Sequence, residues 1–195
     1  MAEVSDIKEN NTNQGFDLKA ETYDWVEAVV FSVAVIVLIF TFFFRIVGVE
    51  GTSMTNTIQN GDRVIISGIE YTPKQFDIVV LSTKAVDKPI IKRVIAVGGQ
   101  TVDIDYDTNT VYVTDSSGNK TAIKEPFIKV AMNKIQGEIV NLPAKVPKGC
   151  VFVMGDNRND SLDSRYSEIG MIDDRNILGR AVLRLFPFNS FGVLK

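Results

Sequence analysis

The most informative absence in this sequence of 195 residues is histidine, of which there is none. Catalytic pairs of serine or cysteine with histidine, and metal sites with histidine ligands, are therefore excluded within this chain. If the protein catalyses a hydrolytic reaction, its base has to be a lysine, an aspartate or a glutamate.

Cysteine and positive charge are also scarce. The single cysteine, Cys150, excludes an intramolecular disulfide, and its place in the apolar run CVFVMG favours a small buried residue over a thiol nucleophile. A net charge of −3 gives no electrostatic reason to expect nucleic-acid binding. An apolar content of 45% is sufficient for one folded domain plus a smaller segment.

The sequence contains one long apolar run, WVEAVVFSVAVIVLIFTFFF, from Trp25 to Phe44. At about 1.5 Å per residue, a helix of this length matches the thickness of a bilayer's hydrocarbon core. A buried core helix would be shorter, and a cleaved secretory signal would be followed by a small-residue pattern that is absent here. We expect a membrane-spanning helix over residues 23–45, preceded by a disordered polar tail over residues 1–22.

Short β-rich runs make up most of the remaining sequence, and Gly, Asn, Asp and Pro clusters separate them. They are DRVIIS (62–67), DIVVLS (77–82), IIKRVIAV (90–97), TVDIDY (101–106), TVYVT (110–114), CVFVMG (150–155) and GRAVLRLFPF (179–188). We expect a mainly β protein, with an antiparallel all-β domain over residues 46–195. A polar segment broken by prolines indicates an inserted lobe over about residues 100–149.

Three stretches carry candidate chemistry. VEGTSMTNT (49–57) places Ser53 in a glycine-containing turn, although most such serines are structural. PIIKRVIAVGG (89–99) places Lys92 and Arg93 in an apolar strand, so at least one of these cations should be partly desolvated. Burial can lower a lysine pKa from about 10.4 towards neutrality, but an edge-strand lysine that reaches solvent is the simpler alternative.

The third stretch, VMGDNRNDSLDSRY (153–166), concentrates acidic and basic residues and invites comparison with a calcium loop. Arg158 occupies a ligand position in that comparison, and the required glycine is missing. Asp103, Asp105 and Asp107 alternate in a similar way, but Thr108 stands where the glycine should be. We therefore expect no metal and no cofactor.

The apolar helix followed by GTSM, IIKRVIAVGG and GDNRNDSLDSR resembles the bacterial type I signal peptidases, of the compact Gram-positive kind. The resemblance extends from about residue 22 to the C-terminus. It implies that Ser53 is the nucleophile, that Lys92 is the general base, and that the backbone amide of Ser53 serves the oxyanion hole. It also implies supporting residues: Ser161, which hydrogen-bonds and orients the lysine, Asp156, and an ion pair of Asp163 with Arg165.

Two positions depart from the pattern of this family. Gly51 stands where some members have a serine that completes the oxyanion hole, so the second donor is open. Asn56 replaces the proline of S-M-x-P-T, a change expected to loosen the turn without touching a catalytic atom.

The resemblance implies a single-pass enzyme of the cell membrane, with a cytoplasmic tail and an extracytoplasmic catalytic domain. Its partners would be the lipid bilayer and secretory preproteins, from which it removes signal peptides after small residues in an A-x-A pattern. The substrate would pair as a strand beside residues 89–92. Candidate substrate-binding residues are Gly51, Met54, Val49, Ile90 and Ile91.

Two other functions are open at this point: a Ser-Lys peptidase dedicated to one partner, and a catalytically silent membrane-anchored binding domain. The oligomeric state is open too. The presence of Ser53, Lys92 and Ser161 together argues against the silent domain.

Overall fold

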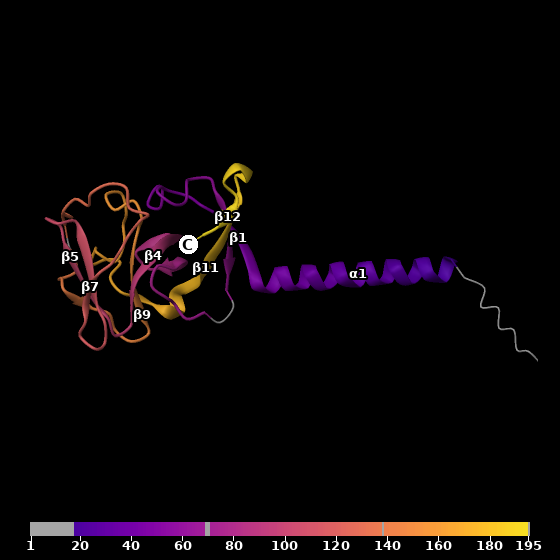
Figure 1. Ribbon diagram of the computed structural model, residues 1–195, viewed down its shortest axis with the longest axis horizontal. Coiled ribbons are helices and arrows are strands. Elements are labelled where there is room, and N and C mark those ends of the chain that lie inside the picture. Colours follow the sequence, from indigo (N-terminus) through magenta and orange to yellow (C-terminus); the bar gives the residue numbers. More distant parts are fainter. Residues whose placement is uncertain (1–17, 69–70, 138, 195) are drawn as a thin grey trace, which may run out of the picture. The chain divides into compact units, whose positions relative to one another are not determined.

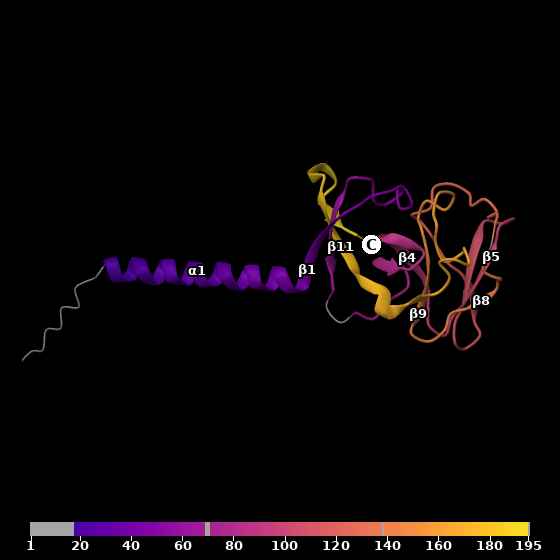
Figure 2. The same cartoon turned by 180° about the vertical axis from the view of Figure 1, so that it is seen from behind.

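The computed structural model describes residues 18–68, 71–137 and 139–194 (Figures 1 and 2). A disordered tail was expected over residues 1–22, and residues 1–17 of it lie outside the described residues. Residues 18–22 are helical instead, because the helix extends upstream of the apolar run.

The helix α1 (Leu18–Phe43) is drawn as one uninterrupted element in Figure 1. Within it, Glu21–Phe43 is long and apolar enough to cross a membrane by length and composition. The helix ends earlier than the expected boundary at residue 45. Phe44 and Arg45 begin strand β1 instead, because their backbone pairs with Ser67 and Ile66 of strand β2.

The β domain is built on an antiparallel eight-stranded sheet. Seven strands follow the order β1-β2-β11-β3-β4-β9-β10, and the eighth, β12, pairs with β11. Its strands are β1 (Phe44–Gly48), β2 (Arg63–Ser67), β3 (Ile78–Thr83), β4 (Val86–Val97), β9 (Cys150–Met154), β10 (Ile172–Asp173), β11 (Ile177–Phe186) and β12 (Gly192–Val193). Two short 3-10 helices, η1 (Asp174–Asn176) and η2 (Phe188–Ser190), flank β11.

The residues of the expected inserted lobe form a second antiparallel sheet of four strands in the order β7-β6-β5-β8. These strands are β5 (Thr101–Asp105), β6 (Thr110–Thr114), β7 (Lys120–Ala122) and β8 (Ala144–Lys145). In both cartoon views, strands of this sheet lie on one side of the domain and β4, β9 and β11 lie on the other (Figures 1 and 2). Strand β9 connects the two sheets through the core, because Phe152 and Met154 pack with apolar residues of β5 and β6.

Every β-rich run predicted from the sequence is a strand, and the mainly β fold with one N-terminal apolar helix is confirmed. The prediction missed β1 and the short strands β7, β8, β10 and β12. These four short strands have only two or three residues each, and their pairing depends on neighbours that local sequence does not reveal.

Strand β4 lies in the middle of the large sheet and has apolar clusters on both faces. One cluster includes Ile78, Val80 and Ile91, and the other includes Val79, Val94 and Ile90. Side chains alternate along a strand, so adjacent residues of β4 enter opposite clusters. The two adjacent cations Lys92 and Arg93 are consequently both buried.

The two edges of β4 are paired over different lengths. Strand β3 pairs along β4 from Val86 to Arg93, whereas the register with β9 begins only at Arg93. Among the described residues, the part of β4 before Arg93 therefore has no partner strand on the β9 side.

Candidate active site

Ser53 and Lys92 lie within hydrogen-bonding distance of each other, although 39 positions separate them in the chain. Ser53 is half-buried in the turn that follows β1, and Lys92 is in β4. The Nζ–Oγ distance is 2.7 Å, and Nζ also donates to the carbonyl of Ile91 at 3.1 Å. Lys92 is only 3% exposed, so its ammonium group has lost nearly all contact with solvent.

The environment of Lys92 favours the neutral amine. Burial lowers its pKa from 10.5 to about 8; the nearby negative charge of Asp163 opposes this shift, and the positive charge of Arg165 adds to it. At pH 7 about one lysine in ten is then neutral and able to accept a proton. A hydroxyl in contact with such an amine is the geometry of a nucleophile and its general base.

Behind this pair lies a cluster of buried polar side chains from the stretch 153–166. Asp163 receives hydrogen bonds from Arg165, Nε to Oδ1 at 2.8 Å and Nη2 to Oδ2 at 2.9 Å, which confirms the predicted ion pair. The Ser161 hydroxyl donates to Asp163 Oδ2 at 2.7 Å. Within the described part of the chain, no hydrogen bond joins Ser161 to Lys92. The hydrogen bond from Ser161 to Lys92 that was expected from the sequence is therefore not present. Ser161 instead bonds to Asp163, and the charge of Asp163 acts on the lysine.

Gly155 is an essential spacer that the sequence analysis did not single out. A Cβ at this position would lie 2.3 Å from Ser161 Oγ and 2.5 Å from the carbonyl oxygen of Ser53. Its backbone N–H donates to Asp163 Oδ2 at 3.0 Å. Only glycine lets the nucleophile turn approach the Ser161 and Asp163 cluster this closely.

The nucleophile turn is tied to the loop after β9 by several hydrogen bonds. Asn157 donates from its backbone to Ser53 O at 2.9 Å and from its side chain to Thr52 O at 3.2 Å. Asn56 donates to Asp156 O at 2.8 Å. The replacement of proline by Asn56 was expected to loosen the turn, but its amide instead supplies a tie to that loop.

Asp156 and Arg93 form a second buried ion pair on the other face of β4. Arg93 donates from Nε to Oδ1 at 2.8 Å and from Nη2 to Oδ2 at 2.7 Å, and both side chains are 1% exposed. The Thr57 hydroxyl donates to the same carboxylate, and the Asp156 amide donates to Met54 Sδ at 3.4 Å. Asp156 therefore connects the strand of Lys92 to the turn of Ser53.

The five candidate substrate-binding residues occupy different environments. Met54 and Val49 are 2% and 6% exposed and belong to the core beneath the turn. Ile90 and Ile91 are half-buried and belong to opposite clusters of β4. Gly51 is exposed and has a φ of +98°, a conformation that favours glycine and is strained for serine.

The backbone N–H of Ser53 donates to no acceptor among the described residues. A free amide next to the nucleophile is the group that an oxyanion hole requires. This observation is consistent with the role expected for the Ser53 amide.

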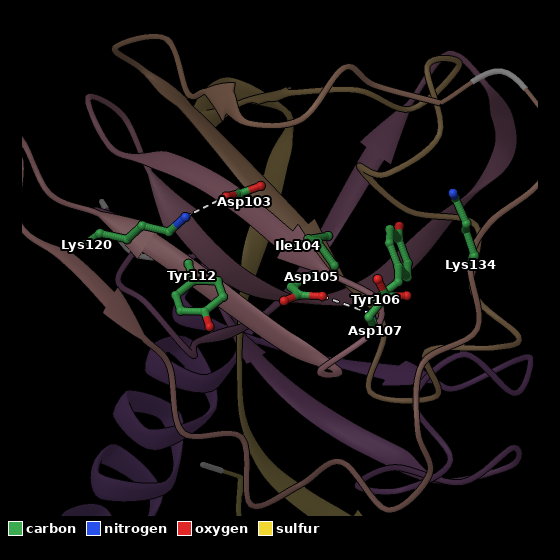
Figure 3. Close-up of a pocket in the computed structure, with 8 residues that line it drawn as sticks. All are labelled: Asp103, Ile104, Asp105, Tyr106, Asp107, Tyr112, Lys120 and Lys134. Carbon is green, nitrogen blue, oxygen red and sulfur yellow. Dashed lines mark hydrogen bonds and ion pairs between the residues drawn. The ribbon is translucent and has the colours of Figure 1, made fainter.

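A separate open cavity of about 520 Å³ lies in the lobe, lined by residues of β5, β6, β7 and the following segment (Figure 3). Apart from Ile104, the residues that line it have polar groups, and Lys120 pairs there with Asp103 at 2.7 Å. Asp103, Asp105 and Asp107 all contribute to the lining. Across the described ranges, no group of three or more acidic, cysteine or histidine side chains is arranged to hold a metal ion.

An antiparallel β domain that brings a serine hydroxyl against a buried, low-pKa lysine has the architecture of a serine hydrolase. Comparison with known proteins agrees with this class. The family model described as signal peptidase, peptidase S26, matches residues 22–186. The chain therefore belongs to the signal peptidase family, and it is a peptidase.

Individual relatives are similar over nearly the whole chain. A signal peptidase I of Bacillus licheniformis is 34% identical, with 94% of this chain and 96% of the relative covered. Signal peptidase I T of Bacillus subtilis (strain 168) is 35% identical, covering 96% and 97%. A crystal structure of a signal peptidase I from Enterococcus faecalis V583 aligns with a TM-score of 0.44 at 25% identity, covering 56% of this chain and 97% of that one.

Proposed function

We propose that this protein is a membrane-anchored endopeptidase that removes signal peptides from exported preproteins, with Ser53 as nucleophile and Lys92 as general base. The observation that carries the proposal is the 2.7 Å contact between Ser53 Oγ and Lys92 Nζ in a water-poor environment. The pKa of about 8 supplies the neutral amine that this role requires.

In the acylation step, neutral Lys92 takes the proton of the Ser53 hydroxyl while Oγ attacks the scissile carbonyl carbon. The oxyanion that forms is stabilised by the free N–H of Ser53. Protonated Lys92 then donates its proton to the leaving amine as the C–N bond breaks. The signal-peptide fragment stays attached to Ser53 as an ester, and the mature protein leaves with a new N-terminus.

In the deacylation step, Lys92 is again neutral and takes a proton from a water molecule that attacks the ester carbonyl. The C–Oγ bond breaks, and Lys92 returns the proton to Ser53. One buried lysine thus serves both half-reactions. Burial lowers its pKa, and the charges of Asp163 and Arg165 modify that shift in opposite directions.

The substrate would bind as an extra strand along the part of β4 before Arg93, where β9 provides no partner. Ile90 and Ile91 are half-buried candidates within that part of β4, and Gly51 is an exposed candidate two residues before Ser53. Met54 and Val49 are buried, so they would limit the depth of the subsites from below. Shallow subsites accept small side chains, which supports cleavage after an A-x-A pattern.

The proposal includes anchoring by α1 with the β domain on the extracytoplasmic side. The helix has the length and composition of a membrane span. Strand β1 begins at Phe44, directly after the helix, and the Ser53 turn follows β1. So short a connection would keep the active site near the membrane surface, where the cleavage sites of translocating preproteins emerge.

The test is cleavage of a preprotein with an A-x-A signal by the full-length protein in detergent, together with Ser53→Ala and Lys92→Met. We expect the wild-type protein to cut after the second alanine. Each variant should lose at least about 10⁴-fold in kcat, because the two groups act as one unit.

Two results would contradict the proposal. Cleavage by Lys92→Met would show that another group is the base. Failure of the wild-type protein to cut any A-x-A preprotein would favour a peptidase dedicated to one partner or a silent binding domain.

A further inference from the structure

One irregular segment of the lobe, residues 123–133, lies against the catalytic part of the domain and outside both sheets. Its backbone is anchored to the small sheet at one end, where the amide of Ile123 donates to Val111 O at 3.0 Å. Two of its side chains, Glu125 and Phe127, contact buried arginines of the site. Neither residue belongs to the nucleophile and base pair or to the motifs that surround it.

Glu125 forms an ion pair with Arg158, and the two side chains are 11% and 2% exposed. Arg158 Nη1 donates to Glu125 Oε2 at 3.0 Å, and Nη2 donates to Oε1. The Nε of the same arginine donates to the carbonyl of Gly155 at 3.2 Å. Glu125 therefore fixes the side chain that holds the Gly155 carbonyl, at the point of closest approach to Ser53 and Ser161.

Phe127 contacts the other arginine. The guanidinium carbon of Arg93 lies 3.9 Å from the centre of the Phe127 ring, a cation–π geometry. The ring also meets Phe76 edge-on, with centroids 5.9 Å apart. Phe76 supplies its carbonyl oxygen to Arg93 Nη1 at 2.8 Å. Phe127 thus packs against the Arg93 guanidinium, which in turn binds Asp156.

A third connection joins the end of the segment to the loop after β9. Asn159 donates from its side chain to Ala131 O at 2.9 Å and accepts from the backbone N–H of Asn133 at 2.8 Å. The segment is therefore attached to the stretch 153–166 at Arg158 and Asn159, and to β4 at Arg93.

We propose that Glu125 and Phe127 are positioning residues of the active site, through which the lobe holds the Ser53 turn against Lys92. The inference rests on the proposed function. Each acts through an arginine, because Arg158 fixes Gly155, and Arg93 fixes Asp156 and the residues of the turn bonded to it. Both arginines are buried. Loss of the Glu125 charge leaves Arg158 without its carboxylate, and loss of the Phe127 ring removes the aromatic contact that holds the Arg93 guanidinium in place, so either change lets the loop shift.

Glu125 and Phe127 would have a purely structural role if the small sheet needed them for its packing. That sheet, however, has its own apolar core. Val102, Val111 and Val113 pack there with Phe152 of β9 and need neither Glu125 nor Phe127. Glu125 instead directs its charge at Arg158, and Phe127 directs its aromatic face at Arg93; both arginines are buried and bonded to the loop after β9. Effects on catalysis should therefore exceed effects on folding.

The experiment compares Phe127→Leu, Phe127→Tyr and Glu125→Gln with wild type, using the full-length protein and an A-x-A preprotein. Lys120→Gln is the matched control, because it breaks the partly exposed Lys120–Asp103 pair of the same lobe (Figure 3). We expect Phe127→Leu and Glu125→Gln to lower kcat by about tenfold or more with little change in KM, since small displacements of reacting groups are costly. Phe127→Tyr keeps the aromatic face and should retain most of the activity, as should Lys120→Gln.

Hydrogen exchange supplies a second reading that needs no substrate. In Phe127→Leu and Glu125→Gln, the amides of Asn157 and Ile58, which bond to Ser53 O and Met54 O, should exchange faster than in wild type. In Lys120→Gln they should not.

The outcomes separate this inference from the proposed function. If wild type cuts the preprotein but Phe127→Leu and Glu125→Gln keep its kcat, the inference is wrong and the proposed function stands. If wild type cuts nothing, the proposed function fails, and the exchange measurement alone decides whether the lobe holds the turn. Unchanged exchange at Asn157 and Ile58 in both variants would overturn the inference.

Discussion

Two adjacent residues of β4 enter opposite faces of the large sheet, and both are cations. Arg93 is 1% exposed and faces a carboxylate that it contacts through two nitrogens. Lys92 is 3% exposed, and its hydrogen bonds go to a hydroxyl and a carbonyl. Asp163, the carboxylate whose charge raises the pKa of Lys92, is already bonded to Arg165 and Ser161.

Strand β4 thus holds one cation in a structural ion pair, Arg93, and one beside the candidate nucleophile, Lys92. A buried cation with a carboxylate in contact keeps its proton, whereas burial beside neutral acceptors alone lowers the pKa of a cation and makes its proton easier to lose. Arginine suits the first role because it stays protonated, and lysine suits the second because its pKa shifts readily. Folding destabilises the ammonium form of Lys92, and this is what prepares the amine to act as a base.

The largest expected effect on stability is at the paired cation. Asp156→Asn removes the charge that balances Arg93 and should lower the free energy of unfolding by roughly 3–5 kcal/mol, the usual cost of breaking a buried ion pair from one side. Urea unfolding in detergent measures this loss. Lys88→Met is the control, because it breaks the exposed Lys88–Glu50 pair and should leave the unfolding midpoint unchanged. Equal effects of the two variants would contradict the distinction between buried and exposed pairs.

The unpaired cation should show an effect of the opposite sign. Because the folded-state pKa of Lys92 is about 8 and its ordinary value is 10.5, folding expels a proton between these pH values. The cost, roughly 3 kcal/mol, is fully present below pH 8 and disappears as the pH rises towards 10.5. Lys92→Met should therefore be more stable than wild type at neutral pH while being inactive.

Thermal unfolding at several pH values tests this expectation. The advantage of Lys92→Met should shrink steadily above pH 8. A variant that is less stable than wild type at neutral pH would show that folding does not destabilise the ammonium form of Lys92.

A smaller effect is expected from Ser161→Ala. The Ser161 hydroxyl stabilises the charge of Asp163, and that charge raises the pKa of Lys92. Without the hydroxyl, more of the Asp163 charge acts on Lys92, so the acidic limb of the pH–rate profile should move upward by up to about one pH unit. If Ser161 orients the lysine directly, kcat should instead fall at every pH without a shift. Ser116→Ala, an exposed serine of the lobe, is the matched control.

The sequence was sufficient to predict the fold class, the main strands and the apolar helix, and its resemblance to a known family implied the ion pair of Asp163 with Arg165. These features depend on local patterns or on residues close together in the chain. It indicated that at least one of Lys92 and Arg93 would be desolvated, but it could not show that both are. That result depends on apolar clusters covering both faces of β4, which form only when distant strands assemble.

Contacts between distant segments were not predictable. Gly155 has to be glycine because of Ser161 and the Ser53 turn, and nothing in its local sequence indicates that constraint. Asn56 interrupts a motif, and only the folded structure shows that its amide reaches Asp156. Glu125 and Phe127 lie in a proline-broken polar stretch that has no periodic pattern.

If buried Lys92 is the base for Ser53, the pH dependence of kcat/KM for preprotein cleavage has to follow the titration of its amine. The rate should be level above about pH 8 and fall about tenfold for each pH unit below it, as the neutral amine is lost. A rate that stays level down to about pH 6 would contradict a lysine base in this environment.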